Sequence, residues 1–372
     1  MSSLPLYMQL LIGPGVPVPV PQELMDALTG VEVTSNTRSA SIFQLTFSMT
    51  PTRAAALILA AQAPMMRVVI LVVVNGIPEV LMDGLVTHSQ LAPGSDSSTT
   101  TLNITGEDLS KAMDYLPFDG LPYPAQTENV RVMAILGKYA ALGIQPRVMP
   151  PITSDVQSPT TGYPRQQGTD LAYVKQLAAE CGYEFYVDPG PLPLQSVAYW
   201  GPSIRAGVPQ RALNTNMDAE TNVESMSFSF DPEGPELPIV MVYSNETKVG
   251  IPIPIPSTNP LNPPLGAIPA IPKKYRIDRT SARRNPGKAL MVAMAAAARS
   301  GDAVTGSGSL NVSRYGRVLK ARQLVGVRGA GLPFDGLYFV QSVKHSIKRG
   351  EYKQNFNLVR NGIMPTTPVV IP

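Results

Sequence analysis

The first third of the chain carries short runs in which apolar and polar residues alternate, the pattern of half-buried β-strands. These runs predict strands over residues 42–49, 68–74, 80–82, 85–88 and 101–105. Asn75-Gly76 is the strongest hairpin signal, because both residues tolerate the positive φ of a two-residue turn. One helix is expected over 52–61, after the capping residue Thr50. Residues 31–109 are therefore expected to form a β-rich unit.

The middle of the chain changes to helical spacing and predicts an α/β unit over 121–211. Thr127 can cap a first helix. The apolar face of that helix is predicted to contain Val130, Met133, Ala134, Ile135 and Tyr139. A second helix is expected from Thr169 or Asp170 to a stop at Cys181-Gly182, and a strand over 183–187 follows it directly.

Strand patterns return after residue 213 and are interrupted once. They predict strands at 223–230 and between 306 and 358. The interruption holds a proline-rich segment and a helix with Asn285 as N-cap, Pro286 at the first helical position and Gly301 just past the end. The simplest interpretation is a second β-unit that is discontinuous in the sequence. The proline-rich segment and the helix are inserted into it, and we call this insertion the excursion.

The last strands form the clearest pattern of the chain, a hairpin whose turn is supplied by residues 348–351. In its first strand, Leu337, Phe339 and Gln341 alternate with Tyr338, Val340 and Ser342. In its second strand, Tyr352, Gln354, Phe356 and Leu358 alternate with Lys353, Asn355, Asn357 and Val359.

Composition limits the class of protein. A chain of 372 residues with 44% hydrophobic and 15% charged residues can form two to four compact units. The net charge of +3 is not gathered in a block of either sign, which argues against a dedicated nucleic-acid binder. Cys181 is the only cysteine, which excludes an intrachain disulfide and favours reducing conditions of assembly. The apolar windows are shorter than the roughly 20 residues of a membrane span, and the N-terminus does not resemble a secretory signal.

Prolines are unusually frequent, with 38 in the chain, and they alternate with apolar residues at 16–21 and 251–256. Because proline lacks the amide proton of a β-ladder, both runs are expected to be extended straps on edges or surfaces. A ligand for an SH3-type domain, with the Pro-x-x-Pro spacing of Pro260 and Pro263, is the less favoured alternative.

Few residues could carry catalysis. The only histidines, His88 and His345, fall in β-segments and are interpreted as structural residues at strand edges. No Gly-x-Ser-x-Gly nucleophile motif occurs. Two acid pairs could perform acid–base chemistry on glycans, although they lie where caps and turns favour acids: Glu107 with Asp108, and Asp231 with Glu233. We therefore expect no catalytic residue, no cofactor and no metal site.

Two separated motifs resemble the baseplate hub proteins of contractile tails. The first is the helix and strand at 168–188, which is similar to an Asp-x-x-Phe/Tyr-x-x-x-Leu-Ala-x-x-x-Gly-Tyr/Phe-x-Phe signature. The second is the C-terminal hairpin, with its Phe-Asp-Gly-Leu-Tyr-Phe-Val strand, Val-Lys-His-Ser segment and Tyr-x-x-x-Phe-x-Leu-x-Arg finish. The family includes the late-control D proteins of phages and the hub half of VgrG-type spike proteins.

The resemblance spans about residues 31–360 and implies an α+β, mainly β chain. It implies two tube-type β-barrel domains, an α/β domain between them and an insertion in the second barrel. The expected boundaries are a first barrel with a proline-rich strap at 1–110, an α/β outer domain at 111–211, a second barrel at 212–245 and 302–362, a strap-and-helix insertion at 246–301, and a C-terminal tail at 363–372.

The resemblance also implies a homotrimeric hub, in which two barrels per chain give a pseudo-hexameric ring between the hexameric tail tube and the trimeric central spike. Expected partners are the tail tube protein, a spike on a separate polypeptide, the tape-measure protein and baseplate wedge subunits, with DNA or cargo only passing through the lumen. The expected location is the tail baseplate of a virion, after assembly in the host cytoplasm. Seven residues are expected to line or support the ring: Val68, Ile70, Val72, Val74, Phe339, Gln341 and Val343.

Two other function classes stay open. A tail-associated peptidoglycan-degrading enzyme would lose activity when one acid is changed. A monomeric, adhesin-like β-protein would form no rings. The scarcity of histidine and the absence of a nucleophile motif favour assembly over catalysis. The sequence does not distinguish a phage from a tailocin or an injection system.

Overall fold

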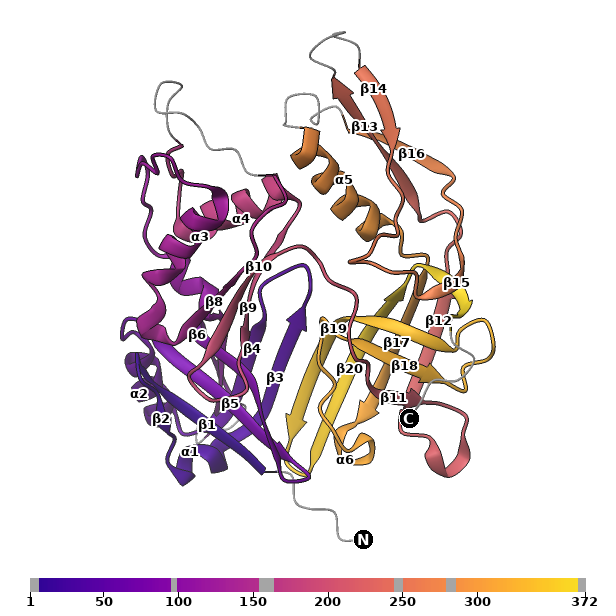
Figure 1. The fold of residues 1–372 in the computed structure, drawn as a ribbon. Helices are drawn as coiled ribbons and strands as arrows, with labels where there is room; N and C mark the ends of the chain where they lie inside the picture. The colour runs from indigo at the N-terminus through magenta and orange to yellow at the C-terminus, as the bar shows by residue number, and fades with distance from the viewer. Residues whose placement is uncertain (1–6, 95–98, 154–163, 244–249, 279–285, 367–372) are drawn as a thin grey trace.

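A computed structural model describes residues 7–94, 99–153, 164–243, 250–278 and 286–366 (Figure 1). The chain is mainly β, as the sequence predicts. Within these residues, thirteen strands form one sheet. Its main path runs through β12 (Ser225–Phe230), β17 (Val304–Asn311), β20 (Glu351–Arg360), β19 (Gly336–Lys348), β3 (Leu28–Asn36), β4 (Ile42–Met49), β7 (Thr100–Asp108), β6 (Ile77–Pro93), β5 (Met66–Val74), β1 (Tyr7–Pro14) and β2 (Val18–Pro19). A side branch consists of β18 (Leu324–Arg328), which pairs with β19, and β11 (Gln210–Asn214), which pairs with β18.

The two β-units expected from the sequence meet where β3 pairs with β19. The ladder is antiparallel and runs from Val31 opposite Ile347 to Asn36 opposite Ser342. Figure 1 shows indigo β3 and yellow β19 side by side at the centre of the molecule. One buried hydrophobic cluster extends through both units, from Phe43 and Val72 to Val340 and Phe356. The two units therefore share one continuous sheet and one core.

The Asn75-Gly76 hairpin is confirmed. It joins β5 to β6 with Val74 opposite Ile77. Asn75 has φ 52° and Gly76 has φ 80°, the backbone of a primed two-residue turn. The helix expected beside it is α2 (Pro51–Ala61), with Thr50 as its N-cap residue.

The strands expected at 80–82 and 85–88 are one strand, β6, and this separation is a wrong prediction. Asp83 and Gly84 were read as turn residues, but both are buried in the sheet. Asp83 accepts two hydrogen bonds of 2.7 Å from Arg67, whose side chain is also buried. A Cβ on Gly84 would lie 2.2 Å from the carbonyl oxygen of Glu107, so the missing side chain lets β7 approach.

The α/β unit packs two helices against a small sheet. The helices are α3 (Glu128–Gly137) and α4 (Asp170–Cys181), and the sheet has the order β8 (Ile144–Val148), β10 (Ser196–Gly201), β9 (Glu184–Pro189). The ends of α4 are as expected: Thr169 Oγ1 accepts from the backbone N–H of Ala172 at 3.2 Å, and Gly182 has φ 69°. The short 3-10 helices η1 (Leu109–Asp114) and η2 (Ala140–Leu142) complete the unit.

The apolar face expected for α3 is partly wrong: Ile135 is buried and Tyr139 packs against the same core, but the other expected members are exposed. Val130 and Met133 are each 46% exposed. The buried side instead combines apolar residues with two charged ones: Glu128, Arg131, Val132, Ile135 and Leu136. The helix is rotated because both charged side chains find partners inside the protein, and buried charges require such partners.

The excursion forms a separate layer with its own small sheet. The sheet has the order β14 (Gly250–Pro254), β13 (Glu236–Tyr243), β16 (Lys274–Asp278), and α5 (Pro286–Ser300) packs against it. The prolines at 251–256 thus fall on an edge strand and the segment after it, the positions where a missing N–H is tolerated. Asn285, the expected N-cap, lies outside the described residues. The remaining elements are β15 (Gly266–Pro269), β21 (Gly362–Pro365), α1 (Gln22–Ala27), η3 (Asp218–Glu220) and α6 (Val312–Tyr315).

Candidate functional site

The seven residues expected to line or support a ring lie on two strands of the large sheet. Six of them are buried in this chain: Val68, Ile70, Val72, Val74, Phe339 and Val343. Those on β5 belong to the shared core, as does Val343. Phe339 packs in a smaller cluster with Leu265, Leu324 and Val359. Their contribution to a ring stays a prediction.

Gln341 differs from the other six because it is a β-bulge and is partly exposed. The register of β19 against β20 shifts between Val340 and Ser342, so Gln341 has no direct partner on β20. Its carbonyl oxygen instead accepts from the backbone N–H of Thr37 at 3.0 Å. The bulge shifts the alternation by one residue and explains why Phe339 and Val343, four residues apart, enter different clusters.

Side chains fasten the first β-unit to the second beside the β3–β19 ladder. At the tip of the β5–β6 hairpin, the Asn75 amide donates to the carbonyl oxygen of Gly316 at 3.0 Å. On β6, Glu79 forms an ion pair of 2.6 Å with Lys320. We call the β3–β19 ladder and these two contacts the seam. The seam thus joins the two β-units through both backbone and side-chain contacts.

Arg322 connects the seam to the α/β unit. Its guanidinium donates to the carboxylate of Asp188 at 2.7 Å and to the carbonyl oxygen of Asn36 at 2.5 Å. It also lies over the ring of Tyr186, 4.1 Å from the ring centroid. Nothing local in the sequence marks this arginine as a link between three distant segments.

Arg360 explains part of the hairpin motif. Its fully buried guanidinium donates to the carbonyl oxygens of Asp335 at 2.8 Å and Pro333 at 2.7 Å. It lies over the ring of Tyr338. The arginine at the end of the motif therefore holds the loop that precedes the motif's first strand.

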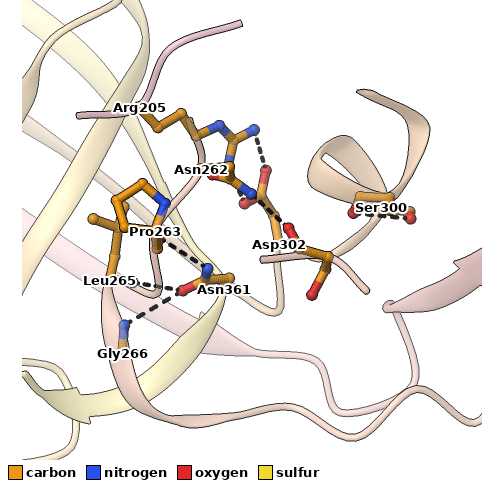
Figure 2. Close-up of polar contacts among 10 residues, drawn as sticks. Arg205, Asn262, Pro263, Leu265, Gly266, Ser300, Asp302 and Asn361 are labelled. Atoms are coloured by element: carbon orange, nitrogen blue, oxygen red, sulfur yellow. Dashed lines mark hydrogen bonds and ion pairs between the residues drawn. The ribbon is translucent and has the colours of Figure 1, made fainter. Parts of the chain in front are cut away.

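A polar anchor fastens both the end of the α/β unit and the excursion to the second β-unit, as Figure 2 shows. Arg205 forms a double ion pair with Asp302, at 2.5 and 3.0 Å. The side-chain oxygen of Asn361 accepts from the backbone N–H groups of Leu265 at 2.9 Å and Gly266 at 3.3 Å. The backbone N–H groups of Leu265 and Gly266 are both buried, so Asn361 satisfies two donors that would otherwise lack a partner.

The candidate catalytic residues have structural contacts. Asp108 accepts from the backbone N–H groups of Ser41 at 2.7 Å and Ser110 at 3.0 Å, and so caps η1. Asp231 accepts from the N–H of Glu233 at 2.9 Å within a turn. Both acids therefore serve a cap and a turn, as interpreted from the sequence.

The histidines differ from each other. His88 is exposed on a part of β6 that pairs only with β7, which fits the expected strand edge. That expectation is wrong for His345, because β19 pairs there with both β3 and β20. Cys181 is buried, and burial raises the pKa of its thiol to about 12. In the described part of the chain, no cluster of three metal-ligating side chains occurs and no helix is long and apolar enough to span a membrane.

Solved structures resemble this chain along nearly its whole length. No protein-family model and no curated protein matches the sequence. The tail protein from Neisseria meningitidis MC58 superposes with a TM-score of 0.62 at 12% identity, over 96% of this chain and 98% of that one. The 43 kDa tail protein of prophage MuSo2 from Shewanella oneidensis gives 0.57 at 15% identity, over 97% and 99%.

A third structure is an E. coli component of the type VI secretion system, described as similar to the T4 bacteriophage tail proteins gp27 and gp5. It gives a TM-score of 0.51 at 13% identity, over 93% of this chain and 77% of that one. The mainly β, hub-like fold expected from the two sequence motifs is thereby confirmed, while its division into two tube-type barrels stays a prediction. This chain has the hub-like fold of phage tail and contractile-tail baseplate proteins.

Proposed function

We propose that the protein is the structural baseplate hub of a contractile tail, located in the virion and assembled in the host cytoplasm. Three copies would form a pseudo-hexameric ring that adapts the hexameric tail tube to the trimeric central spike. The observation that carries the proposal is the seam, because it places two β-units side by side in one sheet within a tail-protein fold.

The symmetry argument follows from this arrangement. A chain that presents two β-units in a fixed relation offers six units when three chains close a ring. Closure would also cover the ends of the large sheet, at β12, β2 and β11, each of which pairs on one side only among the described residues. In this proposal each β-unit corresponds to one tube-type barrel, the first at 1–110 and the second at 212–245 with 302–362, except that β13 (Glu236–Tyr243) pairs in the small sheet of the excursion and not in the large sheet. The α/β domain at 111–211 lies outside the ring.

The β5 residues and Val343 would support the ring wall from within the core. Gln341, whose side chain is partly exposed, would instead lie at the surface of the wall. Proposed partners are the tail tube protein, a central spike protein, the tape-measure protein and wedge subunits, while DNA or cargo passes through the lumen. The proposed role is structural, and it assigns no catalytic step to this chain.

Light scattering of the purified protein tests the proposal, followed by negative-stain averaging of the same peak. The expected result is a particle of three times the chain mass of 39.8 kDa with a central hole and six similar lobes. A monomer that forms no ring even with tube and spike proteins added would overturn it and favour the adhesin-like alternative. Release of peptidoglycan fragments that stops in a Glu233→Gln variant would favour the enzyme.

A further inference from the structure

A large groove lies between the α/β unit and the excursion. Its volume is about 1160 Å³. Residues of α4 and β9 line one side and residues of α5 and β16 line the other, while Phe339 and Gln341 of β19 reach it from the large sheet. The helices approach each other closely at one point, where a Cβ on Gly182 would lie 2.6 Å from the carbonyl oxygen of Met291. The groove is therefore formed by packed elements from three parts of the fold.

The groove carries an excess of positive charge. Its lining includes six basic side chains, Arg38, Lys175, Arg205, Arg276, Arg299 and Arg322, and two acidic ones, Asp108 and Glu184. Arg205 and Arg322 are neutralised by Asp302 and Asp188. The other four basic residues are exposed, and none forms an ion pair with the residues that the structure describes. Asp108 neutralises little of this positive charge. Burial raises the pKa of its carboxyl group, and the carboxylate already accepts hydrogen bonds from two backbone N–H groups.

One side of the groove includes an edge strand of the small sheet in the excursion. Among the described residues, β16 pairs only with β13 and has no partner on its other side. Arg276 and Ile277 are consecutive on β16, and both line the groove. Pro238, which lies opposite Arg276 on β13, lines the groove as well, so the groove reaches two neighbouring strands of this sheet, of which β16 is the outer one. Such an edge offers backbone donors and acceptors to an added strand.

We propose that this groove binds an extended, acidic peptide segment of a partner protein, which adds a strand to the free edge of β16. Acidic side chains of the peptide would face Arg276 and Arg299, and an apolar one would cover Ile277, which is 56% exposed. A polypeptide fits better than a nucleic acid because only a polypeptide completes a β-ladder. Three of the aromatic rings that line the groove, Phe339, Tyr186 and Tyr183, already pack against Arg205, Arg322 and Trp200, which disfavours them as a stacking platform for bases. The inference does not depend on the proposed function.

Selection of short random peptides on the full-length protein tests this proposal, with affinities then measured by fluorescence anisotropy. We expect selected peptides in which acidic and apolar residues alternate. Their Kd should rise by about tenfold or more for the Arg276→Glu/Arg299→Glu variant, because like charges then face each other. The matched control is Arg314→Glu, an exposed arginine on α6 outside the groove, which should leave the Kd unchanged. Circular dichroism and urea unfolding verify that the variants are folded.

Hydrogen exchange tests the added strand separately, since bound peptide should protect backbone amides of residues 274–278. Failure to select peptides, selection of peptides that are not acidic, or equal binding to the double variant would overturn the proposal. Tighter binding of a mixed-sequence single-stranded oligonucleotide, lost in the same variant, would assign the groove to nucleic acid. If the double variant loses self-association in light scattering, the groove binds a second copy of this chain. That result would also overturn the proposal of a peptide from a partner protein.

Discussion

His345 and Tyr352 are joined inside the large sheet by a hydrogen bond of 2.7 Å between Nδ1 and the phenol oxygen. Both side chains are buried. The amide of Gln354 is oriented by two hydrogen bonds with the backbone of Leu319, so its Nε2 faces the same Nδ1 at 3.3 Å as a donor. Nδ1 must therefore accept, and the neutral ring carries its proton on Nε2.

Acid is expected to destabilise the protein through His345. Burial lowers its pKa to about 4, from an ordinary value of 6.5. Below pH 6.5 the unfolded chain binds a proton that the folded chain excludes, so this contribution to stability is complete above pH 6.5 and is lost as the pH falls towards 4. Between pH 7 and pH 5 the free energy of unfolding should drop by about 2 kcal/mol from this residue.

Urea unfolding at both pH values measures the effect of His345. The control is His345→Asn, which keeps an acceptor near the position of Nδ1 but does not titrate. Its free energy of unfolding should depend less steeply on pH than that of the wild type. Equal pH dependence of the two proteins would show that His345 does not carry the effect.

A methyl group at Gly84 should be far more costly than one at Gly30, although both glycines lie in strands of the same sheet. The Cβ of Gly84→Ala would meet the carbonyl oxygen of Glu107 at 2.2 Å, whereas that of Gly30→Ala would lie 4.0 Å from its nearest neighbour, Thr46. We expect Gly84→Ala to lower the free energy of unfolding by about 3 kcal/mol. Gly30→Ala should change it by less than about 1 kcal/mol, with a gain expected from the stiffer unfolded chain. Urea unfolding of both variants checks this, and similar costs would contradict the close approach of β7.

Local signals in the sequence predicted local structure well. The Asn75-Gly76 turn, the caps of α4 and the alternation in the second strand of the C-terminal hairpin each depend on residues within a few positions of one another. The hub-like fold was predicted from two motifs of this kind, at 168–188 and in the hairpin. Arg360 shows why the hairpin motif is informative, because its two ends contact each other.

Long-range partners could not be predicted from the sequence. The seam pairs Val33 with His345, residues more than three hundred positions apart, and no local pattern selects that register. The rotation of α3 has the same origin. Glu128 is buried because it forms an ion pair with Lys288 of α5, a segment far along the chain. From the sequence alone, a charged residue is expected to be exposed, because the partner that allows its burial can lie far away in the chain.

The buried charges of Glu128, Arg131 and Lys288 should act as a unit that holds α5 to α3. The Lys288 ammonium lies 2.5 Å from Glu128 Oε1, while Arg131 lies 3.7 Å from the same oxygen and donates to the Tyr173 hydroxyl at 2.7 Å. Lys288→Met would remove the nearest positive charge from the buried Glu128 carboxylate, whose negative charge would then be only partly neutralised. We expect the free energy of unfolding to fall by about 3 kcal/mol.

A double-mutant cycle with Glu128→Gln measures this coupling. The double variant Glu128→Gln/Lys288→Met should lose less stability than the sum of the two single variants, because no unpaired carboxylate is left in it. The control is Lys273→Met, which removes an exposed ion pair of 3.4 Å with Glu233 and should change the free energy of unfolding by less than about 0.5 kcal/mol. Additive losses in the cycle would contradict a coupled unit.

The reactivity of Cys181 should report whether α5 stays in place. The thiol is buried near this charge cluster, and burial raises its pKa to about 12. At pH 8 only about one native thiol in ten thousand would be a thiolate, so iodoacetamide should label the folded protein very slowly and the urea-unfolded protein readily. Lys288→Met should accelerate native labelling, because loosening α5 exposes the end of α4, whereas Lys273→Met should not. Rapid labelling of the folded wild type, measured by mass spectrometry, would show that the thiol is not enclosed. Equal rates in the two lysine variants would mean that Cys181 becomes accessible without movement of α5.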